Sequence, residues 1–144
     1  MKRLSLKFMI STLMAMMLMI PDMAIAGDIV IIGNQSVAES KLSKQDVKNI
    51  YLGRKTFWSG KKKIVFVTLG NADLSVKFLA EYINMIPSRY ADYWLNKVYT
   101  GQGSPPRSFA SDKEMIDFVA RTEGAIGYVS SGKGLDNVKI FAVE

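Results

Sequence analysis

Hydrophobic and polar residues form blocks along this chain that predict alternating strands and helices. Continuous apolar runs bounded by turn residues predict four strands, at 28–32, 64–67, 125–129 and 138–143. Apolar positions at helical spacing predict four helices, at 44–52, 74–86, 89–100 and 112–123. This order predicts an α/β domain with a mixed sheet of about four strands flanked by about four helices.

Capping residues define the ends of these helices. Three serines stand where N-caps are expected, and the last begins a capping-box pattern: Ser43, Ser88 and Ser111. Gly53 and Gly101 follow helices in the position that favours a left-handed backbone. Residues 101–106 read GQGSPP, which can continue neither a helix nor a strand, so they predict an ordered loop.

The first 26 residues follow a different pattern. Three basic residues precede an apolar run at 8–20, and Pro21 breaks the run before the small residues Ala24 and Ala26. This pattern is typical of a secretory signal peptide, because a helix of that length spans about 20 Å, short of the roughly 30 Å of a bilayer core. We expect cleavage after Ala26, one domain over 27–144, and a bacterial periplasmic location. An uncleaved membrane anchor is the alternative.

Two missing residue types restrict the chemistry. The chain contains no cysteine and no histidine, which excludes disulfides, thiol nucleophiles, Cys/His zinc sites and imidazole catalysis. We therefore expect a protein that is not an enzyme and that holds no cofactor and no metal. The whole chain has a net charge of +6, and removal of the leader, with its three basic residues and one acidic residue, leaves +4. This mild positive charge favours small anions or acidic envelope partners over nucleic acid once the chain is outside the cytoplasm. Residues 61–63 form the only basic run, which a solvated turn explains most simply.

Two other motifs have structural explanations. Residues 127–134 match the G-x-x-x-x-G-K part of a phosphate-binding loop, but Gly134 stands where that motif requires Ser or Thr, and no helix follows. Asp112, Glu114 and Asp117 begin a predicted helix, where acidic side chains favour the helix dipole.

The turns that follow the first two strands are the candidate ligand site. A strand that leads into a helix leaves free N–H groups that can hold an anion. The small or hydrogen-bonding residues in these two turns are Asn34, Ser36, Gly70, Asn71 and Ser75. Because ligands of α/β sheets gather at the carboxyl ends of strands, we expect both turns to form one shallow crevice. Asp73 would repel an anion there, and a purely structural role as caps and turns is the alternative.

Several segments together resemble the periplasmic phosphate-binding component of ABC transporters. The similarity covers about residues 28–143, and the matching segments are 42–53, 57–61, 93–94, 100–106 and 124–129. Trp58 and Trp94 match as bulky anchors of the core. The resemblance implies a single-lobe domain like that of periplasmic binding proteins, corresponding to the second of the two lobes that close on phosphate.

The ligand motif differs from this family. Its phosphate receptors have an arginine after the strand and Ser-Gly-Thr at the helix start, whereas residues 67–75 here read VTLGNADLS, with no arginine between Arg54 and Arg89. The resemblance implies a substrate-binding protein of a phosphate or related anion ABC transport system, working with a membrane transporter, either alone or as a homo-oligomer in which a second copy supplies the missing wall. The alternative is an interaction module that docks onto a sensor or another envelope protein through its helix ends and residues 61–63.

Overall fold

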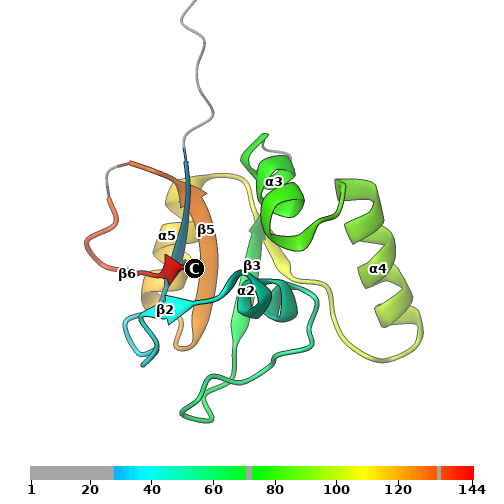
Figure 1. Cartoon of the computed structure of the whole chain (residues 1–144), viewed down its shortest axis with the longest axis horizontal. Coiled ribbons are helices and arrows are strands. Elements are labelled where there is room, and N and C mark those ends of the chain that lie inside the picture. The colour runs from blue at the N-terminus through cyan, green and yellow to red at the C-terminus, as the bar shows by residue number, and fades with distance from the viewer. Residues whose placement is uncertain (1–27, 71–72, 133) are drawn as a thin grey trace, which may run out of the picture.

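A computed structural model describes residues 28–70, 73–132 and 134–144, which form a twisted sheet with helices on both faces (Figure 1). The predicted signal peptide lies outside the described residues. The strands are β1 (Ile29–Gly33), β2 (Lys41–Leu42), β3 (Val65–Leu69), β4 (Arg107–Phe109), β5 (Ala125–Ser130), β6 (Lys139–Ile140) and β7 (Ala142–Val143). The helices are α2 (Lys44–Tyr51), α3 (Asp73–Phe78), the π-helical turn η1 (Leu79–Ile83), α4 (Pro87–Tyr99) and α5 (Asp112–Arg121). None of the helices in this part of the chain is long and apolar enough to cross a membrane.

The sheet is mixed, as the sequence predicts. Its strand order is β4-β3-β5-β1-β6, and a separate pair is formed by β2 and β7. Strand β3 runs parallel to β4 and β5, whereas β1 runs antiparallel to β5. The carboxyl end of β1 and the carboxyl end of β3 therefore lie at opposite ends of the sheet.

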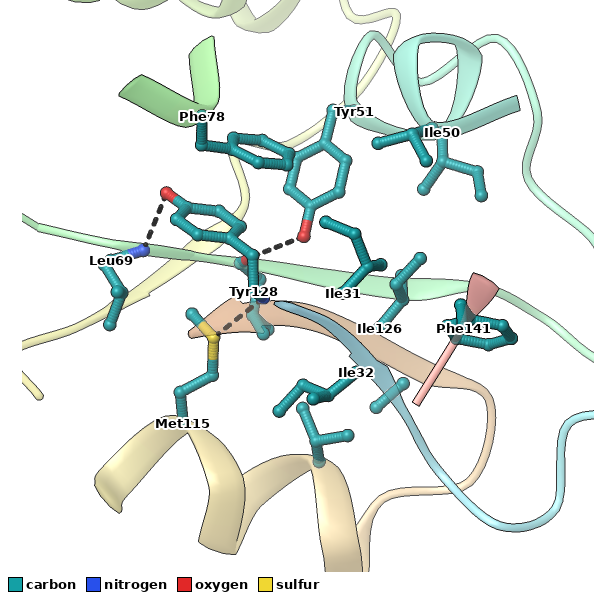
Figure 2. Packing of buried hydrophobic residues seen from close by; sticks show 14 of the residues in the cluster. Ile31, Ile32, Ile50, Tyr51, Leu69, Phe78, Met115, Ile126, Tyr128 and Phe141 are labelled. Atoms are coloured by element: carbon teal, nitrogen blue, oxygen red, sulfur yellow. Dashed lines mark hydrogen bonds between the residues drawn. The ribbon is translucent and has the colours of Figure 1, made fainter. Parts of the chain in front are cut away.

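Two apolar layers cover the sheet. Helix α5 packs on one face, where Met115 and Val119 are fully buried, while α2 and α3 pack on the other. Figure 2 shows Tyr51 and Phe78 on that second face above Tyr128, whose ring stacks on Phe78 with centroids 3.8 Å apart. Burial of these large side chains is the main source of stability.

Three aromatic side chains attach α4 to the C-terminal end of α2. The hydroxyl of Tyr90 donates to the carbonyl of Tyr51 at 2.8 Å, and the hydroxyl of Tyr93 donates to the carbonyl of Leu52 at 2.7 Å. Trp94 is only 5% exposed between them. The last carbonyls of a helix lack partners within the helix, so these tyrosines satisfy the end of α2 while they fix α4 in place.

Several predicted boundaries are confirmed. Ser43 forms a complete capping box with Asp46, and Gly53 and Gly101 both follow helices with φ of 68°. Residues 103–106 form no helix or strand, and no helix follows β5 in the described part of the 127–134 motif. Trp58 is a core anchor, 3% exposed, with its indole N–H donating to the carbonyl of Gly124 at 2.9 Å.

Other boundaries were predicted wrongly. Ser88 is not an N-cap, because α4 starts at Pro87 with Ile86 as its N-cap; proline suits the first helical position, where an N–H would have no partner. Ser111 caps α5, but Glu114 bonds back to the N–H of Ala110 rather than to the cap residue itself. The predicted strand at 138–143 is divided between β6 and β7, which belong to different sheets.

Candidate functional site

A pocket of about 280 Å³ lies at the carboxyl end of β3, between the start of α3 and the start of α4. Its walls combine hydroxyl groups, one carboxylate and apolar side chains: Thr68, Leu69, Asp73, Ser75, Val76, Leu79, Pro87, Tyr90, Ala91 and Tyr128. Its position agrees with the expectation that ligands gather beyond the carboxyl ends of strands.

A closed ring of three hydrogen bonds forms the inner wall of this pocket. The N–H of Leu69 donates to the Tyr128 hydroxyl oxygen at 3.1 Å, as Figure 2 shows. The Ser75 hydroxyl donates to the carbonyl of Leu69 at 2.5 Å, and the two hydroxyl oxygens are 2.7 Å apart. Because Ser75 gives its hydrogen to the carbonyl, Tyr128 donates to Ser75. The ring satisfies the backbone of Leu69 where β3 ends.

Burial keeps these phenols protonated. Desolvation raises the pKa of Tyr128, although the hydrogen bonds with Ser75 and with the Leu69 N–H act in the opposite direction. Desolvation also raises the pKa of Tyr90 and that of Tyr51. At neutral pH the pocket therefore presents hydroxyl groups rather than phenolate charges.

Gly70 and Ser75 lie at this end of the sheet, whereas Asn71 lies outside the described residues. The N–H of Gly70 donates to the carbonyl of Phe109 at 2.9 Å, so it serves the pairing of β3 with β4. The N–H of Gly70 and the hydroxyl of Ser75 are therefore both engaged inside the protein. An anion could use either of these two donors only by displacing its present hydrogen bond.

Asn34 and Ser36 lie at the opposite end of the sheet. The Asn34 side chain is buried and donates to the carbonyls of Val119 and Ala120, at 2.7 and 3.0 Å, so it caps the C-terminal end of α5. The Ser36 hydroxyl accepts from the N–H of Gly124 at 3.2 Å. These two residues therefore fix the turn from α5 into β5.

The prediction that both turns form one crevice is wrong. It assumed that the first two predicted strands run in the same direction, but β1 is antiparallel to β5 and β3 is parallel to it. The hydrophobic pattern of a strand reports its burial and contains no information on its direction, so this error could not be seen in the sequence.

Thr68 and Tyr128 also line the pocket, although neither is among the candidate site residues predicted from the sequence. The Thr68 hydroxyl lies 3.5 Å from the carbonyl of Arg107, longer than a normal O–H···O hydrogen bond, so it remains the least engaged hydroxyl in the pocket. Tyr128 could have been found from its position as a phenol inside an otherwise apolar strand. A buried tyrosine hydroxyl usually requires a polar partner, which points to a polar group nearby.

Charge limits what the pocket can bind. Asp73 is the only charged residue among the described residues that line it. A fully ionised anion such as sulfate would meet this carboxylate without a neutralising cation, whereas hydrogen phosphate can donate its own proton to it. Within the described residues no group of three or more Asp and Glu side chains could hold a metal ion.

Comparison with known proteins agrees with this architecture. A model of the PBP superfamily domain matches residues 19–142. The chain belongs to the PBP superfamily. Among curated proteins, none matches it.

Solved structures extend the comparison to the fold of this PBP-superfamily chain. A Clostridium perfringens protein, solved with bound phosphate and named as a phosphate ABC transporter substrate-binding protein, matches with a TM-score of 0.64 and 19% identity over 81% of this chain and 45% of that one. PstS from Borrelia burgdorferi has a TM-score of 0.61 and 15% identity over 82% and 47% of the two chains. An ABC-type phosphate transport receptor from Vibrio cholerae has a TM-score of 0.56 and 21% identity over 81% and 46%. The chain thus spans less than half the length of each of these proteins.

Proposed function

We propose that this chain is a non-catalytic, exported component of a phosphate or related anion ABC transport system, and that it binds hydrogen phosphate at the carboxyl end of β3. The observation that carries the proposal is the hydroxyl-lined pocket there, in a fold shared with several phosphate-binding proteins. The pattern of residues 1–26 supports export to the periplasm.

Hydroxyl groups can bind an anion by donating hydrogen bonds to it, even though the one charged side chain described in this pocket, Asp73, is negative. Thr68 is free to turn its hydrogen toward a ligand, and Ser75 can do the same if it releases the carbonyl of Leu69. Releasing one such bond costs about 1 kcal/mol, which a charge-assisted hydrogen bond to phosphate offsets. Asp73 would accept the proton of hydrogen phosphate and so select it over sulfate.

Calorimetric titration of the exported protein with phosphate and sulfate tests the proposal. We expect phosphate to bind with a Kd of about 10 μM or tighter, roughly −7 kcal/mol, and sulfate to bind at least tenfold more weakly. Ser75→Ala should weaken phosphate binding about tenfold, because a ligand donor is lost. Ser36→Ala, the matched change at the other end of the sheet, should leave the affinity unchanged. Equal loss in both variants, or equal affinity for the two anions, would contradict the assignment.

A second candidate function is an interaction module for an envelope protein. Along α4, beside residues 105–106, lies an apolar hollow of about 440 Å³, and Leu95 and Val98 on this helix are 53% and 44% exposed. Exposed apolar side chains around a hollow favour protein contacts. The sequence also suggested the basic run at 61–63 as a contact surface. Within this run, the Lys62 ammonium pairs with the Glu123 carboxylate at 3.2 Å.

The two functions respond differently to mutation. Under the interaction hypothesis, a Leu95→Glu/Val98→Glu variant should lose an envelope partner captured by crosslinking while it still binds phosphate. A triple variant with glutamate at Lys61, Lys62 and Lys63 should also lose the partner if the basic run contributes to that contact. An unchanged crosslinking pattern in both variants would remove these surfaces from consideration.

A further inference from the structure

A separate hollow of about 290 Å³ lies at the amino end of β3, between the end of α2 and the loop that follows α4. It shares no lining residue with the pocket at the carboxyl end of the strand. Among the described residues that line it are three lysines, Lys55, Lys63 and Lys97, and no aspartate or glutamate. We call it the lysine pocket.

Two of the three lysines have no carboxylate partner. Lys55 pairs with Asp46 at 3.0 Å, whereas Lys63 and Lys97 have no acidic group within 4.0 Å among the described residues. An anion in the lysine pocket would be attracted mainly by Lys63 and Lys97, because Asp46 already compensates the charge of Lys55.

The inner wall of the lysine pocket is aromatic. Trp94 and Phe66 line it with their ring centroids 5.5 Å apart, and the Lys97 ammonium lies 5.8 Å above the Trp94 ring. Gly53 and Gly103 lie against the indole, where an added side-chain carbon would lie 2.9 and 3.3 Å from it, and Trp94 is only 5% exposed. Phe66 is only partly buried, so an apolar or aromatic group of a ligand would pack on Phe66, beside Trp94.

Polar groups at the rim are unused by the protein. Thr56, Gln102 and Ser104 line the lysine pocket, and their side chains form no hydrogen bond with any residue that the structure describes. In the pocket at the other end of β3, by contrast, Ser75 and Tyr128 bond each other. The free donors here suit a ligand with several acceptor oxygens.

We propose that the lysine pocket is a second ligand site, for a small organic anion whose carboxylate or phosphate meets the lysines and whose apolar or aromatic part packs on Phe66, beside Trp94. Inorganic phosphate could pair with the lysines of this pocket but would leave its aromatic wall without a contact. The site is independent of the phosphate pocket proposed above, because the two are lined by different residues.

Phenyl phosphate is a suitable probe, with inorganic phosphate and phenol as its charged and apolar halves. In the exported protein we expect phenyl phosphate to change the fluorescence of Trp94 and to bind at least tenfold more tightly than either half. Trp94→Phe should remove the fluorescence change, which separates it from any signal of Trp58. Binding should weaken as the salt concentration rises.

Matched lysine variants locate the ligand. Lys63→Gln/Lys97→Gln should weaken phenyl phosphate at least tenfold, while Lys61→Gln/Lys113→Gln, which removes the same charge from exposed positions, should change it less than twofold. Ser75→Ala should weaken the binding of inorganic phosphate at the other pocket but leave phenyl phosphate binding intact. The two proposed sites can therefore be refuted separately. Equal effects of the two double variants, phenol binding as tightly as phenyl phosphate, or no binding of phenyl phosphate at 1 mM would each overturn the proposal.

Discussion

Strand β3 borders a different pocket at each of its ends. Among the residues that the structure describes, the pocket at the carboxyl end has hydroxyls that bond one another beside a single carboxylate. In the pocket at the amino end, most of the lysines and polar side chains have no partner within that described part of the chain. The two pockets have similar volumes, about 280 and 290 Å³. Size therefore does not distinguish them. What differs is whether the donors that face the pocket are already engaged, and this decides whether a ligand must displace a hydrogen bond or can form a new one.

The largest effect should come from the backbone beneath the lysine pocket. Gly124 has φ of 74°, and a side-chain carbon there would lie 2.1 Å from the carbonyl of Lys63. Gly124→Ala should cost about 3 kcal/mol or more in the free energy of unfolding, or prevent folding, because the β3–β5 pairing would have to open. Chemical denaturation measures this. Gly60→Ala, which meets nothing within 4 Å, is the control, and equal stability of the two variants would contradict the packing.

At the carboxyl end, Tyr128→Phe should break the hydroxyl ring. The N–H of Leu69 loses its acceptor and Ser75 loses a donor, so we expect a loss of about 2 kcal/mol in stability. Tyr99→Phe, at a position that is 81% exposed, should change stability by less than about 0.5 kcal/mol. Thermal unfolding of the two variants, read together with their phosphate affinity, tests the ring. A Tyr128→Phe protein as stable as the wild type would show that the ring contributes nothing.

Much of the fold could be predicted from the sequence, and the limits have physical causes. The strands near 28–32 and 64–67 were visible because burial on both faces produces continuous apolar runs. Strand β4 was missed because Arg107 and Ser108 are exposed at the edge of the sheet, so their strand has no apolar pattern. The sequence also did not reveal that β1 runs opposite to β3, which places Asn34 and Ser75 at opposite ends of the sheet.

The candidate site was predicted less well than the fold. Ser75 was found because it begins a helix after a strand, but its partner Tyr128 comes from 53 residues further along the chain. The lysine pocket was invisible for the same reason, since Lys55, Lys63 and Lys97 come together only when the end of α4 reaches β3. Sequence patterns report local structure, whereas both pockets are made by contacts between distant segments.

Alkaline pH should affect the tyrosine-rich face that includes the carboxyl-end pocket. Burial raises the pKa of Tyr51, Tyr90 and Tyr128 above the value of about 10 in an unfolded chain. Above pH 10 the unfolded chain loses these protons first, so stability should fall as pH rises, by up to about 1.4 kcal/mol per pH unit for each tyrosine. Urea denaturation from pH 8 to 11 measures the slope. Tyr90→Phe should reduce the slope, and an unchanged slope would contradict the burial effect.

The smallest effect concerns the acidic neighbour of the lysine pocket. A hydrogen bond from Lys55 and one from the backbone N–H of Ser43 lower the pKa of Asp46, so its contribution to stability is present above pH 4 and is lost as pH falls through the lowered pKa. Because the pair is partly exposed, Asp46→Asn should cost about 1 kcal/mol or less at neutral pH. It should also free Lys55 and tighten phenyl phosphate binding about twofold, as fluorescence titration would show. Weaker binding in this variant would mean that Asp46 assists the ligand instead of competing with it.

The central claim, that phosphate binds at the carboxyl end of β3, is tested most directly by an NMR titration that observes both ends of the strand in one sample. With inorganic phosphate we predict saturable shifts of the backbone amides of Leu69, Gly70 and Ser75, while the amides of Ile64, Lys97 and Ser104 remain unchanged. Shifts confined to the lysine-pocket amides, or no saturable shift at either end, would contradict the claim.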